Sequence, residues 1–162
     1  MTRCMIGALK GKAAVITGGG SGIGKSMVER YLAEGASVVA ADINEASLKA
    51  LLEELEPEYG DKLKILKVNV SSKEEVEAMI DYTVEAFGKV DVVINNAGIL
   101  DNLLPIAEMP DDVWERIMNI NLNSVMYACR KAVQYFLKEK REGTIINTAS
   151  LSGLCAGRGG LA

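Results

Sequence analysis

The stretch Thr17-Gly18-Gly19-Gly20-Ser21-Gly22-Ile23-Gly24 decides the fold. It follows a β-branched run at 13–17 and leads into a segment with helical spacing, a pattern typical of a strand, a tight turn and a helix in succession. In such a turn, backbone N–H groups approach a pyrophosphate at the start of the helix, where the helix dipole favours an anion. We expect this turn to bind the pyrophosphate of a cofactor, and its binding residues to be Gly18, Ser21, Gly22, Ile23 and Gly24.

The same region also fits a second kind of phosphate-binding loop. Residues 19–26 match the pattern GxxxxGK[ST], in which Lys25 would bind β/γ-phosphates and Ser26 a magnesium ion, as in a nucleotide triphosphatase. Against this, Ile23 and Met27 fall at helical spacing, so the helix is predicted to begin before Gly24 and to leave Lys25 on its surface. A glycine turn that binds nothing is the remaining alternative.

Short apolar runs alternate with longer amphipathic segments along the rest of the chain, which indicates βαβ units around a parallel sheet. Strands are predicted at 13–17, 37–42, 63–68, 90–95 and 144–148, and helices at about 48–55 (closed by Pro57), 72–88 (a Ser72–Glu75 capping box and a Gly88 stop) and 111–138. The expected fold is α/β, a Rossmann-type doubly wound parallel sheet forming a single dinucleotide-binding domain over residues 1–162.

Composition excludes several classes of function. The net charge of -4 and the scattered basic residues argue against a nucleic-acid partner. Three widely spaced cysteines without a CxxC pair favour neither a disulfide framework nor a zinc site, and the N-terminal apolar run is too short for a membrane span, so we expect a cytoplasmic protein. The absence of histidine excludes a Ser-His-Asp triad and His-rich metal sites, and no metal is expected.

Asp42 ends the second predicted strand, where an acidic side chain can accept hydrogen bonds from both ribose hydroxyls of adenosine. A carboxylate there would repel the 2'-phosphate of NADP, and no Arg or Lys lies between Gly18 and Gly24 to attract it. The sequence therefore predicts NAD rather than NADP as cofactor. The alternative is that Asp42 caps the following helix.

With Asn95-Asn96-Ala97-Gly98, after the fourth strand, the sequence resembles the short-chain dehydrogenase/reductase family. The resemblance covers nearly the whole chain and comprises five motifs in family order: TGxxxGIG at 17–24, Asp42, NNAG at 95–98, Asn121, and an S-x-x-G element at 150–153. It implies that Asn96, Ala97 and Gly98 lie beside the cofactor and that Asn69 and Val70 contact the adenine. Asn69 stands where the family more often has aspartate.

Two further residues are implied to be catalytic. Asn121 falls on the apolar stripe of the predicted long helix, where an amide is costly unless it is hydrogen-bonded. The resemblance implies that it holds a water of a proton-relay chain, and a satisfied core asparagine is the alternative. Ser150 follows the fifth strand, at the sheet edge where ligands bind, and is implied to orient the substrate oxygen. Its spacing to Gly153 favours it over the neighbouring Ser152.

The family's proton-transferring Tyr-x-x-x-Lys pair would fall immediately after Ala162. We therefore expect a domain truncated after its fifth strand, inactive alone, from a protein that interconverts a secondary alcohol and a ketone with NAD(H). The resemblance also implies a homodimer or homotetramer formed through the predicted long helix. A non-catalytic NAD-binding module and, less favoured, a phosphate-loop triphosphatase are the alternatives.

Overall fold

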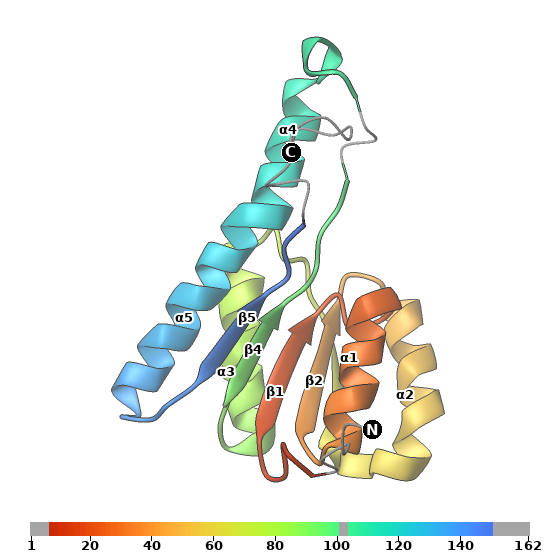
Figure 1. Cartoon of the computed structure of the whole chain (residues 1–162), viewed down its shortest axis with the longest axis vertical. Helices are drawn as coiled ribbons and strands as arrows, with labels where there is room; N and C mark the ends of the chain where they lie inside the picture. Colours follow the sequence, from red (N-terminus) through yellow and green to blue (C-terminus); the bar gives the residue numbers. More distant parts are fainter. Residues whose placement is uncertain (1–6, 101–103, 151–162) are drawn as a thin grey trace, which may run out of the picture.

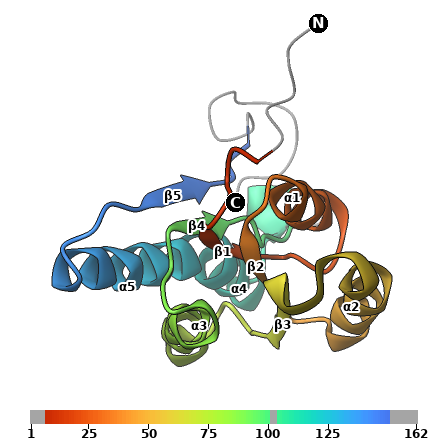
Figure 2. The same cartoon turned by 90° about the horizontal axis from the view of Figure 1, so that it is seen from below.

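The computed structural model describes residues 7–100 and 104–150, and these form a five-stranded parallel sheet with helices on both faces (Figures 1 and 2). The strands lie in the order β3-β2-β1-β4-β5, and every neighbouring pair is parallel. Their bounds are Ala13–Thr17 (β1), Ser37–Asp42 (β2), Leu63–Lys67 (β3), Val92–Asn95 (β4) and Thr144–Asn147 (β5). The predicted α/β class and parallel sheet are confirmed, with strand ends that differ by one or two residues.

The helices form a layer on each side of this sheet (Figure 2). Their bounds are Gly22–Ala33 (α1), Glu45–Tyr59 (α2), Lys73–Phe87 (α3), Asp111–Met118 (α4) and Ser124–Lys138 (α5), with a π-helical turn at Asn119–Asn123 (η3) and 3₁₀ turns at Gly60–Lys62 (η1) and Ile106–Glu108 (η2). Helices α1 and α2 pack on one face of the sheet, and α3 and α5 pack on the other. None of the helices within 7–100 and 104–150 is both long and apolar enough to cross a bilayer.

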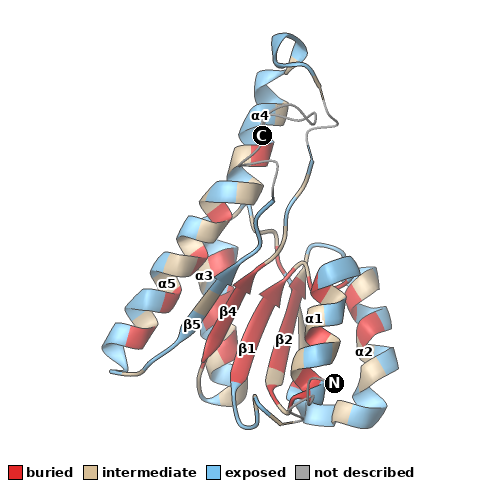
Figure 3. Cartoon of the chain, in the orientation of Figure 1, coloured by how far each residue is buried: buried red, intermediate tan, exposed pale blue. Residues whose placement is uncertain are grey.

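The inner strands are buried on both faces, as their continuous apolar sequence predicts (Figure 3). Ile16 packs in the cluster beneath α1 and α2, whereas its neighbour Val15 packs in the cluster beneath α3 and α5. Strand β5 is different, since three of its four residues are exposed, among them Ile146. The core therefore centres on β1, β2 and β4.

Two helical predictions are wrong. Helix α2 does not close at Pro57 but continues through it to Tyr59 and ends at Gly60, whose φ is +51°. Pro57 lies in the last turn, where the missing N–H removes a single intrahelical hydrogen bond. The predicted single α-helix over 111–138 is interrupted by the π turn Asn119–Asn123, which inserts an extra residue.

The buried face of α4 and α5 matches the predicted apolar stripe in part. The apolar stripe predicted for this helix comprised Trp114, Ile117, Met118, Val125, Cys129, Ala132 and Phe136. Of these, Trp114 is 40% exposed, and Met118, Val125 and Cys129 are half-buried. Ile117, Ala132 and Phe136 are buried as predicted, whereas Ser124 and Ala128 are buried in place of Val125 and Cys129.

Candidate functional site

A cavity of about 400 Å³ opens at the carboxyl edge of the sheet, where the loops after β1, β2, β3 and β4 meet. All eleven residues that the sequence predicts to bind a cofactor line this cavity: Gly18, Ser21, Gly22, Ile23, Gly24, Asp42, Asn69, Val70, Asn96, Ala97 and Gly98. They come from four separate loops, so the fold brings together segments that are up to 80 residues apart in the chain.

The glycine turn has the conformation that its composition requires. Gly18 and Gly22 adopt left-handed φ angles of +67° and +52°, which side-chain-bearing residues rarely take. A Cβ atom at Gly24 would collide with the carbonyl group of Gly18, so that helix α1 can pack against the turn only through a glycine. Ser21 precedes α1 without a side-chain capping hydrogen bond, which leaves the first N–H groups of the helix for an anion.

Lys25 does not take the position of a phosphate-loop lysine. Its Nζ atom lies 2.6 Å from Oε2 of Glu54 on α2 and 3.8 Å from Oε1 of Glu29. The hydrogen bond to Glu54 raises the pKa of the Lys25 ammonium above its ordinary value. Lys25 is absent from the described residues that line the cavity, in agreement with its predicted place on the surface of α1.

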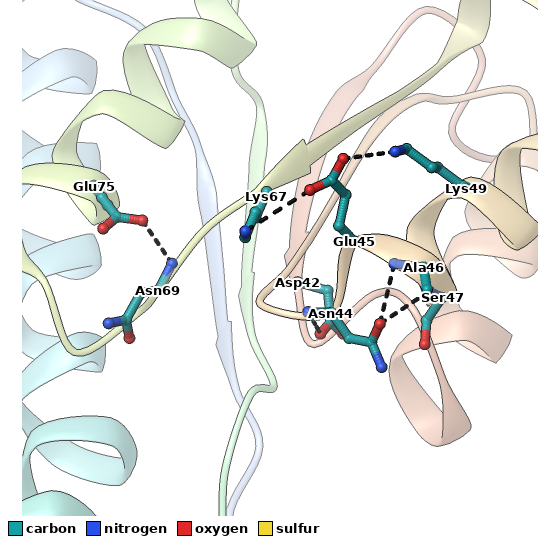
Figure 4. Close-up of polar contacts among 9 residues, drawn as sticks. All are labelled: Asp42, Asn44, Glu45, Ala46, Ser47, Lys49, Lys67, Asn69 and Glu75. Atoms are coloured by element: carbon teal, nitrogen blue, oxygen red, sulfur yellow. Dashed lines mark hydrogen bonds and ion pairs between the residues drawn. The ribbon is translucent and has the colours of Figure 1, made fainter.

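Asp42 links the glycine turn to the start of the next helix. Its Oδ2 atom accepts a hydrogen bond from the Gly20 N–H at 3.0 Å, and its Oδ1 atom accepts one from the Asn44 N–H at 2.9 Å. The N-terminal cap of α2 is Asn44, which accepts hydrogen bonds from the N–H groups of Ala46 and Ser47 (Figure 4). The alternative that Asp42 serves as the helix cap is therefore wrong, and its carboxylate lies at the cavity.

The loop after β3 is held by helix α3. The Asn69 N–H donates to Oε2 of Glu75 at 2.7 Å (Figure 4), and Oδ1 of Asn69 accepts from both the N–H and the hydroxyl of Ser71. Ser72 caps α3 by accepting from the Glu75 N–H, but the Glu75 carboxylate reaches past Ser72 to Asn69. Of the two hydrogen bonds in the predicted capping box, the one from the Glu75 N–H to the Ser72 hydroxyl is confirmed. The one from the Ser72 N–H to the Glu75 carboxylate is wrong, because this carboxylate accepts from the cavity-lining Asn69 instead.

Thr17, the last residue of β1, organises the NNAG turn. Its Oγ1 atom accepts hydrogen bonds from the N–H groups of Asn96 at 2.9 Å and Ala97 at 3.0 Å, while Nδ2 of Asn96 donates to the Thr17 carbonyl at 3.0 Å. On the other side, Nδ2 of Asn95 donates to Oδ1 of Asn147 in β5 at 2.8 Å. These bonds tie β1, β4 and β5 together directly beneath the cavity.

Asn121 lies in the π turn, and its side chain makes two hydrogen bonds to the segment that follows β4. Its Oδ1 atom accepts from the Ile99 N–H at 2.9 Å, and its Nδ2 atom donates to the Ile99 carbonyl at 2.8 Å. The polar side chain on the predicted apolar stripe is therefore satisfied by backbone, as the alternative for this residue requires. Ile99 and Ile120, the residue before Asn121, both line the cavity, which places this bridge at its wall.

Ser150 is exposed and comes three residues after the end of β5. It is not among the described residues that line the cavity. The rest of its predicted motif, Ser152 and Gly153, lies outside the described residues.

Sequence reasoning missed four aliphatic residues of the cavity: Ile43, Val68, Ile99 and Ile120. Ile43 follows Asp42 and is 63% exposed, and Ile23 in the glycine turn is 66% exposed. At the cavity these aliphatic side chains form apolar walls suited to a flat ring. For Ile43 and Val68 the available signal was their position next to a polar residue, Asp42 and Asn69, at a strand end. Ile99 and Ile120 have no such signal, because they come from the loop after β4 and from the π turn.

Comparison with known proteins agrees with this geometry. The family model described as short chain dehydrogenase matches residues 12–162. The chain is 65% identical over 154 residues to 3beta-hydroxysteroid dehydrogenase 2 of Eggerthella lenta, covering 95% of the chain and 59% of that protein. It is 37% identical over 150 residues to a 3beta-hydroxysteroid dehydrogenase of Mediterraneibacter gnavus, covering 93% of the chain and 53% of that protein. The chain thus spans a little over half the length of these relatives.

Solved structures give the same result. A short chain dehydrogenase from Mycobacterium smegmatis superposes with a TM-score of 0.89 at 38% identity, covering 95% of this chain and 64% of that one. A short-chain dehydrogenase/reductase of the glucose/ribitol dehydrogenase type from Brucella melitensis superposes with a TM-score of 0.84 at 28% identity, covering 94% of this chain and 62% of that one.

Proposed function

The chain belongs to the short-chain dehydrogenase/reductase family, and on this premise we propose that the whole protein is an NAD(H)-dependent oxidoreductase that interconverts a secondary alcohol and a ketone. The observation that carries the proposal is the single cavity lined by the glycine turn, Asp42, Asn69 and the NNAG turn. Its polar groups are spaced along one edge of a parallel sheet, the place where open α/β sheets bind dinucleotides.

The residues present fit a dinucleotide. Gly24 lies in close contact with Gly18, and neither residue has a side chain that would cover the start of α1. A diphosphate can therefore reach the backbone N–H groups there. Asp42 would accept hydrogen bonds from the adenosine ribose, and the aliphatic walls formed by Ile43 and Val70 would flank the adenine. Bound there, the nicotinamide ring would supply the hydride chemistry.

NAD is favoured over NADP for an electrostatic reason. Asp42 is an acidic group in the cavity lining, and none of the fifteen described lining residues is Arg or Lys. A 2'-phosphate placed beside Asp42 would meet a like charge without a compensating cation. NADP enzymes of this architecture place an arginine nearby for that phosphate.

For catalysis we assign Ser150 to orient the substrate oxygen and Asn121 to hold the cavity wall and a relay water. Oδ1 and Nδ2 of Asn121 each make one hydrogen bond to Ile99, and a relay water would use the second lone pair of Oδ1 or the second N–H of Nδ2. The tyrosine and lysine that would transfer the proton are expected after Ala162. Within residues 1–162 the last tyrosine and lysine, Tyr135 and Lys140, both precede Ser150 and belong to a different element.

A hydroxysteroid is the substrate class to test first, because the names of the relatives at 65% and 37% identity both specify 3beta-hydroxysteroids. Assembly as a homodimer or homotetramer is supported by aliphatic side chains exposed along the η3–α5 surface: Leu122, Met126, Val133 and Leu137. A cytoplasmic location fits the odd number of cysteines and the expected reducing compartment.

The proposal is tested by titrating the purified full-length protein with NADH and, separately, with magnesium ATP. For the unmodified protein we expect saturable NADH binding and no specific ATP binding. A Lys25→Met variant should bind NADH with unchanged affinity, because Lys25 pairs with Glu54 outside the cavity. Tight magnesium ATP binding without a response to NADH would establish the triphosphatase instead. Binding of NADH without turnover of any secondary alcohol would establish a non-catalytic module.

A further inference from the structure

A cluster of three charged side chains borders the adenosine end of the cavity without lining it. Glu45, the first residue of α2, lies three positions after Asp42. One of its carboxylate oxygens lies 2.7 Å from Nζ of Lys49, one turn along the helix, and the other lies 3.7 Å from Nζ of Lys67 at the end of β3. Figure 4 shows the Glu45 carboxylate between the two ammonium groups.

The sheet register brings Lys67 to this place. Asp42 and Lys67 are paired across the parallel strands β2 and β3, so their side chains leave the same face of the sheet at neighbouring positions about 5 Å apart. Lys67 is therefore a cation next to the carboxylate that is assigned to the ribose. Its ammonium group is drawn toward α2 by Glu45 rather than toward the cavity.

We propose that Glu45 is a second determinant of cofactor choice: by pairing with Lys67 and Lys49, it prevents their ammonium groups from attracting a 2'-phosphate at the adenosine end of the cavity. The inference rests on the proposed NAD-dependent function and deepens it. It assigns discrimination against NADPH to two carboxylates. Asp42 repels the 2'-phosphate directly, and Glu45 neutralises Lys67, the cation paired with Asp42 across the sheet.

The charge state of Glu45 suits this role. The hydrogen bond from Lys49, followed by the charges of Lys49 and Lys67, keeps the pKa of the Glu45 carboxyl below its ordinary value, so it is ionised at neutral pH. Side chains of Glu45 and Lys67 are 50% and 62% exposed, and water and salt therefore weaken their interaction. The effect on cofactor choice is accordingly moderate and decreases as ionic strength rises.

The test measures dissociation constants for NADH and NADPH, by cofactor fluorescence, in the full-length protein and in Glu45→Gln. We expect the ratio of NADPH to NADH dissociation constants to fall by roughly 3- to 10-fold, mostly through tighter NADPH binding, because a freed ammonium group gains one favourable contact with a phosphate. Adding both Lys67→Gln and Lys49→Gln in the Glu45→Gln background removes the two freed ammonium groups and should restore the original ratio.

Asp61→Asn is the matched control. It removes one exposed carboxylate that pairs with another lysine of β3, Lys64 at 2.9 Å, at the opposite end of the strand. If Asp61→Asn shifts the ratio as much as Glu45→Gln, the effect is one of net charge and the inference is wrong. An unchanged ratio in Glu45→Gln also overturns it while leaving NADH binding, and hence the proposed function, intact. Failure of the unmodified protein to bind NADH overturns both.

Discussion

The side chain of Asn121 pairs with both backbone polar groups of Ile99, at 2.9 Å to its N–H and 2.8 Å to its carbonyl. The amide thus makes the two backbone hydrogen bonds that a neighbouring strand would otherwise make with Ile99. Because Asn121 belongs to the π turn η3 and Ile99 to the exit of β4, the pair joins two elements that line the same cavity. π turns are frequent at functional sites, and here the turn brings an amide to a backbone that otherwise lacks a sheet partner.

Replacing Asn121 with Ala should therefore impair both stability and turnover. We expect a loss of about 1–2 kcal/mol in the free energy of unfolding, since the two Ile99 groups lose their partners. A fall of about 10- to 100-fold in kcat should accompany it, because displacement of the cavity wall misplaces reacting groups. Urea denaturation and steady-state kinetics of the full-length protein provide the two measurements.

Asn123→Ala is the control for this prediction. Asn123 lies in the same π turn, but its exposed amide donates to the Asn119 side chain at 2.8 Å rather than to a cavity-lining backbone. We expect a change below about 0.5 kcal/mol and unchanged kcat. Equal effects of the two substitutions would contradict the bridging role of Asn121.

Removing the charge of Asp42 should narrow the preference for NADH over NADPH. Asp42→Asn retains an oxygen that accepts from the Gly20 N–H, so the glycine turn keeps its anchor, whereas Asp42→Ala removes both the charge and the anchor. We expect both variants to bring the two dissociation constants closer by about 10-fold. If NADPH is already the better ligand of the unmodified protein, the assignment of NAD is wrong.

Thr17→Val should destabilise the protein by about 2–4 kcal/mol. The substitution keeps the shape of the side chain but removes the oxygen that accepts from both Asn96 and Ala97, leaving two N–H groups without that partner. Thr83→Val is a suitable control, because the buried Thr83 hydroxyl donates to the Met79 carbonyl within one helix. The control should cost less than about 1.5 kcal/mol, and a similar cost for both would contradict the role of Thr17 as an organiser.

Asp91 should make stability depend on acid pH. Burial by itself raises the pKa of its carboxyl, but the hydrogen bond from the Ala13 N–H and the interaction with Lys89 outweigh this and leave the pKa below its ordinary value. The carboxylate also accepts from Arg141 at 2.9 Å. A depressed pKa in the folded state stabilises the protein above the unfolded value of about 3.9, and this contribution is lost as pH falls through the folded pKa.

The measurement compares unfolding of the unmodified protein and Asp91→Asn across pH 3–7. We expect the variant to be less stable by about 2 kcal/mol at pH 7, and the difference to shrink below about pH 4 as the native carboxylate takes up its proton. Asp81→Asn, which removes an exposed carboxylate paired with a lysine of α5, should change stability by less than about 1 kcal/mol at every pH. A difference for Asp91→Asn that does not vary with pH would refute the linkage.

Prediction from sequence succeeded where short-range patterns carry the information. The strand at 13–17, the glycine turn and the start of α1 follow from residues that are adjacent in the chain, and the structure confirms them. Eleven residues expected to share a ligand do line one cavity, because parallel strands place all their carboxyl ends at one sheet edge. The two wrong helical predictions concern features that short-range patterns do not specify. Helix α2 tolerates Pro57 in its last turn, and a π turn interrupts the predicted long helix.

The sequence by itself determined the succession of strands and helices along the chain, the conformation of the glycine turn and the presence of a carboxylate at the end of β2. Each of these depends on local backbone preference and apolar periodicity. Tertiary structure alone decided that Asn121 pairs with Ile99, that Glu75 holds Asn69, and that Glu45 engages Lys67. These pairs join different segments, and which donor meets which acceptor is fixed only once strands pair in register and helices pack on the sheet.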